Sequence, residues 1–174
     1  MCPKSNRCWR AWPSFPFRSN ATITRRSPPA TRVSSIGRTS TPSTAKNLFL
    51  RNQKGTRHYL VILSVARRAD LRVVAEQIGD GKLSFASAER LKTHLGVTPG
   101  SVSPFGLIHD REHHVRVFLD RELRLAERIS FHPNINTRTV VLAFSDFEKY
   151  LATTWNVVRF VEMTREGQGP SRQA

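Results

Sequence analysis

The chain has 174 residues, a length that suits one folded domain with a tail. Hydrophobic residues make up an ordinary 39% of it, and no apolar run approaches membrane-spanning length, so we expect no membrane partner. The net charge of +15 favours a polyanionic partner. Nucleic acid comes before an acidic membrane surface, because no basic amphipathic helix is present.

Residues 1–45 differ in composition from the rest of the chain. They hold 8 of the 28 basic residues, none of the 13 acidic residues, and six of the ten prolines. They show neither helical nor strand periodicity, so no packed core is expected. Three interpretations are open: a disordered basic arm that binds nucleic acid, a transit peptide, or an out-of-frame segment joined to a true domain. The abrupt change near Lys46 leads us to favour the third.

Both cysteines, Cys2 and Cys8, lie in this segment. They could pair or take part in a metal site, but no second pair of ligands is nearby, so we interpret them as incidental. A reducing compartment is then the default, and we expect a cytoplasmic protein.

Two apolar runs after Lys46 predict a β-hairpin. The runs NLFLRN and RHYLVILS flank the turn sequence QKG, in which Gly55 supplies the turn conformation. A shorter run, KLSFA, predicts a further strand.

Two helices are predicted on either side of this short strand. Asp70 is the N-cap of the first helix, and Gly79 is its stop. Ser87 caps the second helix, which Gly96 closes. The apolar residues of the first helix recur at helical spacing.

The loop VTPGSVSPFG leads to a second predicted hairpin, with arms GLIHD and HVRVFLD joined across REH. The run RELRLAE predicts a short helix. A β-branched run from Thr139 to Phe144 predicts a buried strand.

The last predicted elements are the helix SDFEKYLATT, with a capping box from Ser145 to Glu148, and the strand NVVRFVEM. Residues 164–174 are expected to form a disordered tail. Hairpins and helices alternate irregularly, so we predict an α+β fold with a mixed, twisted sheet rather than a doubly wound one.

Common catalytic signatures are missing from the sequence. It contains no G-x-S-x-G, no H-E-x-x-H and no phosphate-binding glycine loop. His109, His113 and His114 surround the predicted turn of the second hairpin, with two acidic residues between them. A metal site or a solvated polar turn would explain them, and we favour the turn because no second group of ligands completes a set.

Three short stretches carry residues suited to binding or catalysis. The loop from Gly100 to Pro104 could present backbone N–H groups to a carbonyl or oxyanion, or could be a plain connector. Lys46, followed by Asn47, could contact a phosphate or be a solvated charge. The stretch HPNINT sets polar side chains at the mouth of the buried strand, namely those of His132, Asn134 and Asn136. His132 could also be structural, and Asx-turn capping would explain the asparagines.

Together these stretches resemble the YbaK/prolyl-tRNA synthetase-associated editing domain, and among its members the free-standing Ala-tRNA(Pro) deacylases. The resemblance rests on AKNLFLRNQKGTRHYLVIL, LSFASAERLKTHLGVTPGSVSPFGLI and ISFHPNINTRTVVL in this order. It covers residues 46–163, about two-thirds of the chain.

The resemblance implies a compact α+β fold with a mixed, partly barrel-like sheet. It implies hydrolysis of the ester that joins a wrong small amino acid to tRNA(Pro), without a metal or organic cofactor. Prolyl-tRNA synthetase would be a further partner. Such an activated ester needs an oriented water and oxyanion donors more than a strong nucleophile.

The resemblance also assigns roles to the site residues. Lys46 would engage the 3′-terminal phosphate and ribose, with Asn47 beside it, and His132 would lie in the pocket. Asn134 and Asn136 would surround the ester. The aminoacyl carbonyl would be positioned by the loop residues Gly100, Ser101, Val102, Ser103 and Pro104.

Two departures from the family are visible. Residues 1–45 do not resemble the folded segment that walls the pocket in family members, and the usual LIND turn reads LIHD here, with His109. A non-catalytic RNA-binding module and an inactive remnant therefore stay open as alternatives.

Overall fold

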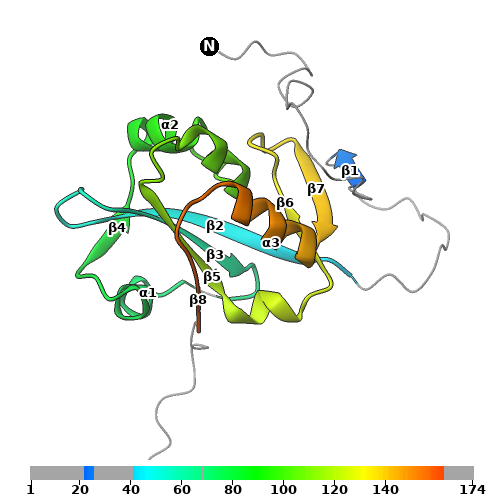
Figure 1. Ribbon diagram of the computed structural model, residues 1–174, viewed down its shortest axis with the longest axis horizontal. Coiled ribbons are helices and arrows are strands. Elements are labelled where there is room, and N and C mark those ends of the chain that lie inside the picture. The colour runs from blue at the N-terminus through cyan, green and yellow to red at the C-terminus, as the bar shows by residue number, and fades with distance from the viewer. Residues whose placement is uncertain (1–21, 26–40, 68, 163–174) are drawn as a thin grey trace, which may run out of the picture.

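The fold is built around one mixed β-sheet of eight strands, in a computed structural model that describes residues 22–25, 41–67 and 69–162 (Figure 1). Seven strands follow the order β1-β7-β6-β2-β3-β5-β8, and β4 pairs with β2 beside this path. Parallel and antiparallel neighbours are mixed: β2 is antiparallel to β3 but parallel to β6. The predicted α+β class is therefore confirmed. The sheet is open rather than barrel-like, because β1 and β8 are not paired with each other in the described residues.

The central hairpin is β2 (Ser43–Asn52) and β3 (His58–Ser64), as the sequence predicts. Gly55 lies in its turn with a φ of 70°, a left-handed conformation that glycine adopts without steric cost. The predicted strand KLSFA is β4 (Leu83–Phe85), which pairs with the end of β2.

The two predicted helices are α1 (Leu71–Ile78) and α2 (Ala88–Leu95), and both cap predictions are confirmed. The Asp70 side chain accepts a hydrogen bond from the Arg72 N–H group, and the Ser87 hydroxyl accepts one from that of Arg90. Gly79 and Gly96 end the helices in left-handed conformations. Local sequence therefore sets these boundaries.

The remaining elements complete the sheet and its covering layers. They are β1 (Thr22–Arg25), the 3₁₀ helix η1 (Pro104–His109), β5 (Val115–Asp120), the 3₁₀ helix η2 (Arg121–Leu125), β6 (Arg128–Phe131), β7 (Arg138–Ala143), α3 (Phe144–Thr153) and β8 (Val158–Val161). Every helix in the described part of the chain is too short or too polar to cross a bilayer.

The second predicted hairpin is wrong in its first arm. GLIHD belongs to the 3₁₀ helix η1, while HVRVFLD forms β5 as predicted. Two features start the 3₁₀ helix: Pro104 stands at its first position, and the Ser103 hydroxyl accepts a hydrogen bond from the Phe105 N–H group. A Cβ on Gly106 would lie 2.7 Å from the Leu95 carbonyl oxygen, so glycine lets η1 pack directly against α2.

The capping box predicted for the last helix is also wrong. Helix α3 starts at Phe144, which the sequence had assigned to the preceding strand, and its N-cap Ala143 makes no side-chain cap. The Phe144 N–H group donates to the Glu127 carbonyl oxygen at 2.9 Å. Glu148 instead lies 3.7 Å from Arg124, so a tertiary ion pair replaces the local cap.

Two apolar clusters cover the two faces of the sheet. The larger cluster joins the sheet to α2, η1 and α3, which together cover one face, as Figure 1 shows for α3 lying across the strands. The smaller cluster joins α1 to the other face through residues such as Leu50, Tyr59 and Val74. The site described below depends on β2, which contributes side chains to both clusters.

Part of the segment 1–45, for which no periodic structure is predicted, forms strands. Strand β2 starts at Ser43, and β1 pairs antiparallel with β7 over four residues. The other residues up to 40 lie outside the described part of the chain, as does the predicted tail 164–174. The domain boundary at Lys46 and the out-of-frame reading of this segment stay predictions.

A buried tyrosine joins the central hairpin to the segment after α1. Tyr59 is fully buried, and its hydroxyl donates a short hydrogen bond to the Asp80 carboxylate. This bond is the main reason why the pKa of Asp80 is lowered. Burial and the same bond raise the pKa of Tyr59 to about 12. A carboxyl group whose pKa is lower in the folded state adds stability that is lost as the pH falls.

We predict that Tyr59→Phe lowers the free energy of unfolding by about 1–2 kcal/mol near neutral pH, because a buried hydrogen bond is lost. The difference from the wild type should shrink below about pH 4, where Asp80 becomes protonated in the unfolded chain. Urea unfolding between pH 3 and pH 7 measures both effects.

Tyr150→Phe is the matched control. The Tyr150 hydroxyl is also buried, but it donates to a backbone carbonyl, that of Pro104, at 3.0 Å. Its stability loss should therefore not depend on acid. The same pH dependence in both variants would contradict the role given to Asp80.

Candidate functional site

Strand β2 pairs with β3 along one of its edges. Its other edge pairs with neighbouring strands at its two ends, but its middle has no strand partner within the described residues. β6 pairs with Ser43 and Thr44, and β4 pairs with residues 50–52. Lys46 and Asn47 lie between these two pairings. The loop from Gly100 to Pro104 contacts this part of β2 at Asn47, and the HPNINT stretch starts two residues after the last β6 residue that pairs with β2. The sheet topology therefore decides where the candidate site lies.

Lys46 and Asn47 are neighbours in a strand, so their side chains point to opposite faces of the sheet. The Lys46 ammonium group donates a short hydrogen bond to the Arg67 carbonyl oxygen, and Lys46 is half-buried. Asn47 Nδ2 donates to the Val102 carbonyl oxygen at 3.0 Å. Asn47 Oδ1 is buried and has no hydrogen-bond partner in the described residues.

The loop from Gly100 to Pro104 is held at both ends. Gly100 has a φ of 84°, and the N–H group of Ser101 donates to the Thr98 carbonyl oxygen at 3.0 Å. At the other end, the Tyr150 hydroxyl donates to the Pro104 carbonyl oxygen. Burial raises the pKa of Tyr150, so its hydroxyl keeps the proton that it donates.

The middle of this loop offers backbone hydrogen-bond donors. The Ser103 hydroxyl caps η1, and the Ser101 and Ser103 side chains are buried, so both serines are structural in this loop. The N–H groups of Val102 and Ser103 donate no hydrogen bond within the described residues. Two successive N–H groups without partners suit a carbonyl oxygen that gains negative charge.

The stretch HPNINT turns sharply between β6 and β7. His132 Nδ1 lies 2.8 Å from the Arg138 carbonyl oxygen, and since a carbonyl only accepts, Nδ1 carries the proton. His132 Nε2 is then left as a hydrogen-bond acceptor. Asn134 has a φ of 58°, and its side-chain Oδ1 is buried without a partner in the described residues.

The structure brings most of the predicted site residues together, but not all. Asn47 contacts the loop at Val102, and Asn136 Nδ2 lies 3.9 Å from the place that a Cβ on Gly100 would occupy. Thr44 and Ser130 are the last residues that pair between β2 and β6, and Lys46 and His132 each lie two residues beyond them. The ammonium group of Lys46, however, lies against Arg67 and on the opposite face from Asn47.

Sequence reasoning missed two residues that support this arrangement. Arg67 supplies the carbonyl that holds Lys46, and Tyr150 supplies the hydroxyl that holds the loop. The helical spacing of Phe147, Tyr150 and Leu151 predicts a buried face for α3, but no local signal links Tyr150 to a loop 46 residues away.

Comparison with known proteins identifies the relatives of the chain. Residues 30–150 match the model of the family "Aminoacyl-tRNA editing domain". The prolyl-tRNA editing protein ProX of Acetoanaerobium sticklandii is 42% identical over 118 residues, which cover 68% of this chain and 72% of that protein. The prolyl-tRNA synthetase associated domain-containing protein 1 of Bos taurus is 32% identical over 114 residues, covering 63% of this chain and 66% of that protein.

Solved structures support the fold. The crystal structure of a protein assigned as a trans-editing enzyme for prolyl tRNA synthetase has a TM-score of 0.52 and 22% sequence identity. That match covers 70% of this chain and 71% of the other. The resemblance seen in the sequence is therefore confirmed: this chain belongs to the aminoacyl-tRNA editing domain family.

Proposed function

We propose that this chain hydrolyses the ester bond of mischarged tRNA(Pro), with Ala-tRNA(Pro) as the substrate. The observation that carries the proposal is the meeting of Asn47, the loop from Gly100 to Pro104 and the HPNINT stretch beside the open edge of β2. Membership of the editing family and the 42% identity to a prolyl-tRNA editing protein support the same reaction. The name of the cattle relative supports prolyl-tRNA synthetase as a further partner, and we expect the reaction to occur in the cytoplasm.

The proposed reaction is the attack of one water molecule on the aminoacyl carbonyl carbon. The bond between that carbon and the ribose oxygen breaks, and the ribose oxygen receives a proton. The products are the free amino acid and tRNA with a free hydroxyl group. The N–H groups of Val102 and Ser103 would donate to the carbonyl oxygen while it carries negative charge.

The polar side chains would position the ester and the water. His132 Nε2, left as an acceptor by the bond at Nδ1, would orient the water or the ribose hydroxyl. The Oδ1 atoms of Asn47 and Asn134, which have no hydrogen-bond partner among the described residues, would accept hydrogen bonds from the α-ammonium group of the amino acid. An ester is activated already, so orientation and oxyanion donors account for much of the expected acceleration.

The proposal is tested with the full chain and purified Ala-tRNA(Pro) and Pro-tRNA(Pro). We expect Ala-tRNA(Pro) to lose its amino acid faster than the spontaneous rate, and Pro-tRNA(Pro) to stay charged because a small pocket excludes proline. Binding of tRNA without any loss of the amino acid would overturn the enzyme in favour of an RNA-binding module. Neither binding nor hydrolysis would indicate an inactive remnant.

Lys46→Ala should weaken tRNA engagement, because we propose that its ammonium group leaves Arg67 and contacts a phosphate. The plot of log KM against log salt should become shallower, since fewer counterions are released on binding. Stability should fall by no more than about 1 kcal/mol, because one partly exposed hydrogen bond is lost. Lys82, which is exposed at the start of β4, offers the control: Lys82→Ala should keep the wild-type salt dependence.

Comparing the single variants Gly100→Ala and Gly79→Ala distinguishes the effect of backbone strain on stability from an effect on catalysis. Both glycines have left-handed φ angles, 84° and 70°, and an added Cβ would meet no atom closer than 3.9 Å at either site. Each substitution should cost roughly 1–2 kcal/mol of stability. Only Gly100→Ala should also lower kcat, by roughly tenfold or more, because the oxyanion donors of the loop move. An equal kcat in the two variants would argue that the loop is a plain connector.

A further inference from the structure

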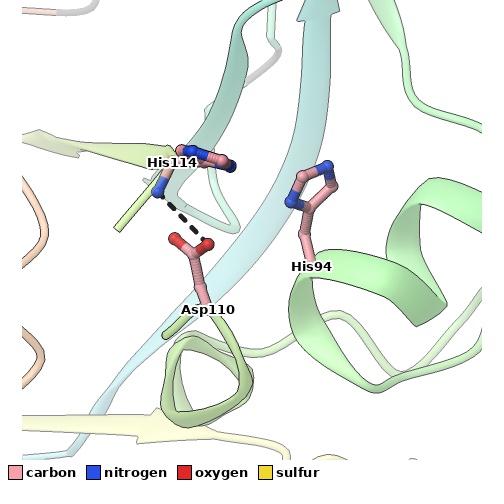
Figure 2. A group of neighbouring side chains, drawn as sticks. All are labelled: His94, Asp110 and His114. Carbon is pink, nitrogen blue, oxygen red and sulfur yellow. Dashed lines mark hydrogen bonds between the residues drawn. The ribbon is translucent and has the colours of Figure 1, made fainter. Parts of the chain in front are cut away.

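Three potential metal ligands converge at one end of helix α2. They are His94 in the last turn of α2, Asp110 at the end of η1, and His114 just before β5 (Figure 2). One ligand atom from each side chain lies within 4.8 Å of the other two. The sequence groups His114 with His109 and His113, but in three dimensions the side chains that lie near it include those of His94 and Asp110.

The packing of η1 against α2 sets this juxtaposition. Gly106 has no side chain, so η1 lies directly against the backbone of Leu95, the residue after His94. The 3₁₀ helix then ends at Asp110, with the Asp110 N–H group donating to the Leu107 carbonyl oxygen. His94 and Asp110, 16 residues apart in the sequence, are thereby brought close by the packing of η1 against α2.

The Asp110 carboxylate is buried and rigidly oriented. It accepts hydrogen bonds from the N–H groups of His114 and Val115, at 3.2 Å and 2.8 Å, and from Asn156 Nδ2 at 2.7 Å. Its exposed fraction is 5%, and it has no ion pair with lysine or arginine in the described residues. A buried carboxylate without a cation favours a positive partner.

The hydrogen bonds of Asp110 show that its side chain caps the turn before β5. They do not account for the presence of two histidines beside it. Within the described residues, neither imidazole is hydrogen bonded to the carboxylate, although both lie near it. Glu112 lies 3.3 Å from His114 Nε2, and such carboxylate–histidine pairs make the imidazole a better ligand. His94 packs on the ring of His58, with centroids 4.1 Å apart, which holds its orientation.

Arg90, a positive charge near His94, is already engaged by other groups. Arg90 Nη1 donates to the Gly55 carbonyl oxygen and lies 2.8 Å from His58 Nε2. Since a guanidinium group only donates, His58 accepts with Nε2 and its ring is neutral in this arrangement. Arg90 is thus tied to the β2–β3 turn, and its charge is not paired with Asp110.

We propose that His94, Asp110 and His114 bind a divalent transition-metal ion of the zinc type. Two imidazoles and one carboxylate are a ligand set that zinc uses, with a fourth position for water. Bonds of about 2.0–2.2 Å would bring the ligand atoms roughly 3.3 Å apart. The exposed His114 side chain can rotate to close this distance, whereas Asp110 stays fixed.

The bound ion would join the two ends of the segment that contains the loop from Gly100 to Pro104. His94 precedes this loop and Asp110 follows it, so the ion would restrict the motion of the segment between them. This consequence rests on the proposed function, but the metal site itself does not.

The test measures metal binding by the metal-stripped full chain. Calorimetry follows the binding of Zn²⁺, and the visible absorption of Co²⁺ in place of Zn²⁺ reports the coordination geometry. All these proteins also carry the substitutions Cys2→Ser and Cys8→Ser, because thiolates bind zinc themselves. We expect one ion per chain, a tetrahedral Co²⁺ spectrum, and a thermal unfolding midpoint that rises to saturation with Zn²⁺.

His114→Ala is the main variant, because this exposed side chain can be removed without disturbing the core. It should weaken zinc binding at least tenfold, and His94→Ala should do the same. His113→Asn is the matched control, since His113 is exposed in the same turn with a φ of 54° that asparagine tolerates. Less than one-tenth of an ion per chain, or equal weakening in the His114 and His113 variants, would overturn the proposal.

Discussion

The divided edge of β2 is the constraint on which the rest of the structure depends. One edge of this strand is satisfied by β3, while the other is shared between β6 at its start and β4 at its end. Backbone groups that no strand covers must find other partners or face solvent. The loop from Gly100 to Pro104 contacts β2 at this interruption through Asn47, and the HPNINT stretch begins just beyond the last β6 residue that pairs with β2. Both carry polar side chains that a continuous sheet would exclude. The site is therefore a consequence of strand pairing, before any side-chain chemistry is considered.

Helices α1 and α2 could be predicted from sequence because their boundaries are set by local capping. Asp70, Ser87, Gly79 and Gly96 act within a few residues of the helix they bound. The elements that were mispredicted depend on distant contacts. GLIHD is too short and apolar to distinguish a strand from a helix, and its 3₁₀ form depends on Gly106 packing against Leu95.

The candidate site shows the same division between local and distant information. The sequence motifs brought Asn47, the loop near Gly100, and His132 into consideration, and their identity follows from resemblance to the editing family. Sequence could not show that Lys46 contacts Arg67, because the turn after β3 has no motif of its own. Nor could it group His94 with Asp110 and His114, since that contact depends on how η1 packs against α2. The residue types within a motif can be seen in the sequence, but the distances between motifs depend on the fold.

The two unpaired asparagine oxygens point to how such a site could select its substrate. A buried acceptor without a partner costs about 1–3 kcal/mol, and neither Asn47 Oδ1 nor Asn134 Oδ1 has a hydrogen-bond partner within the described residues. In the proposed function, the ammonium group of an aminoacyl ester supplies hydrogen-bond donors to these two oxygens, so binding offsets this cost. A tRNA without an amino acid has no such donor at this position. The same two atoms would therefore favour charged over uncharged tRNA, and the size of the pocket would be left to distinguish one amino acid from another.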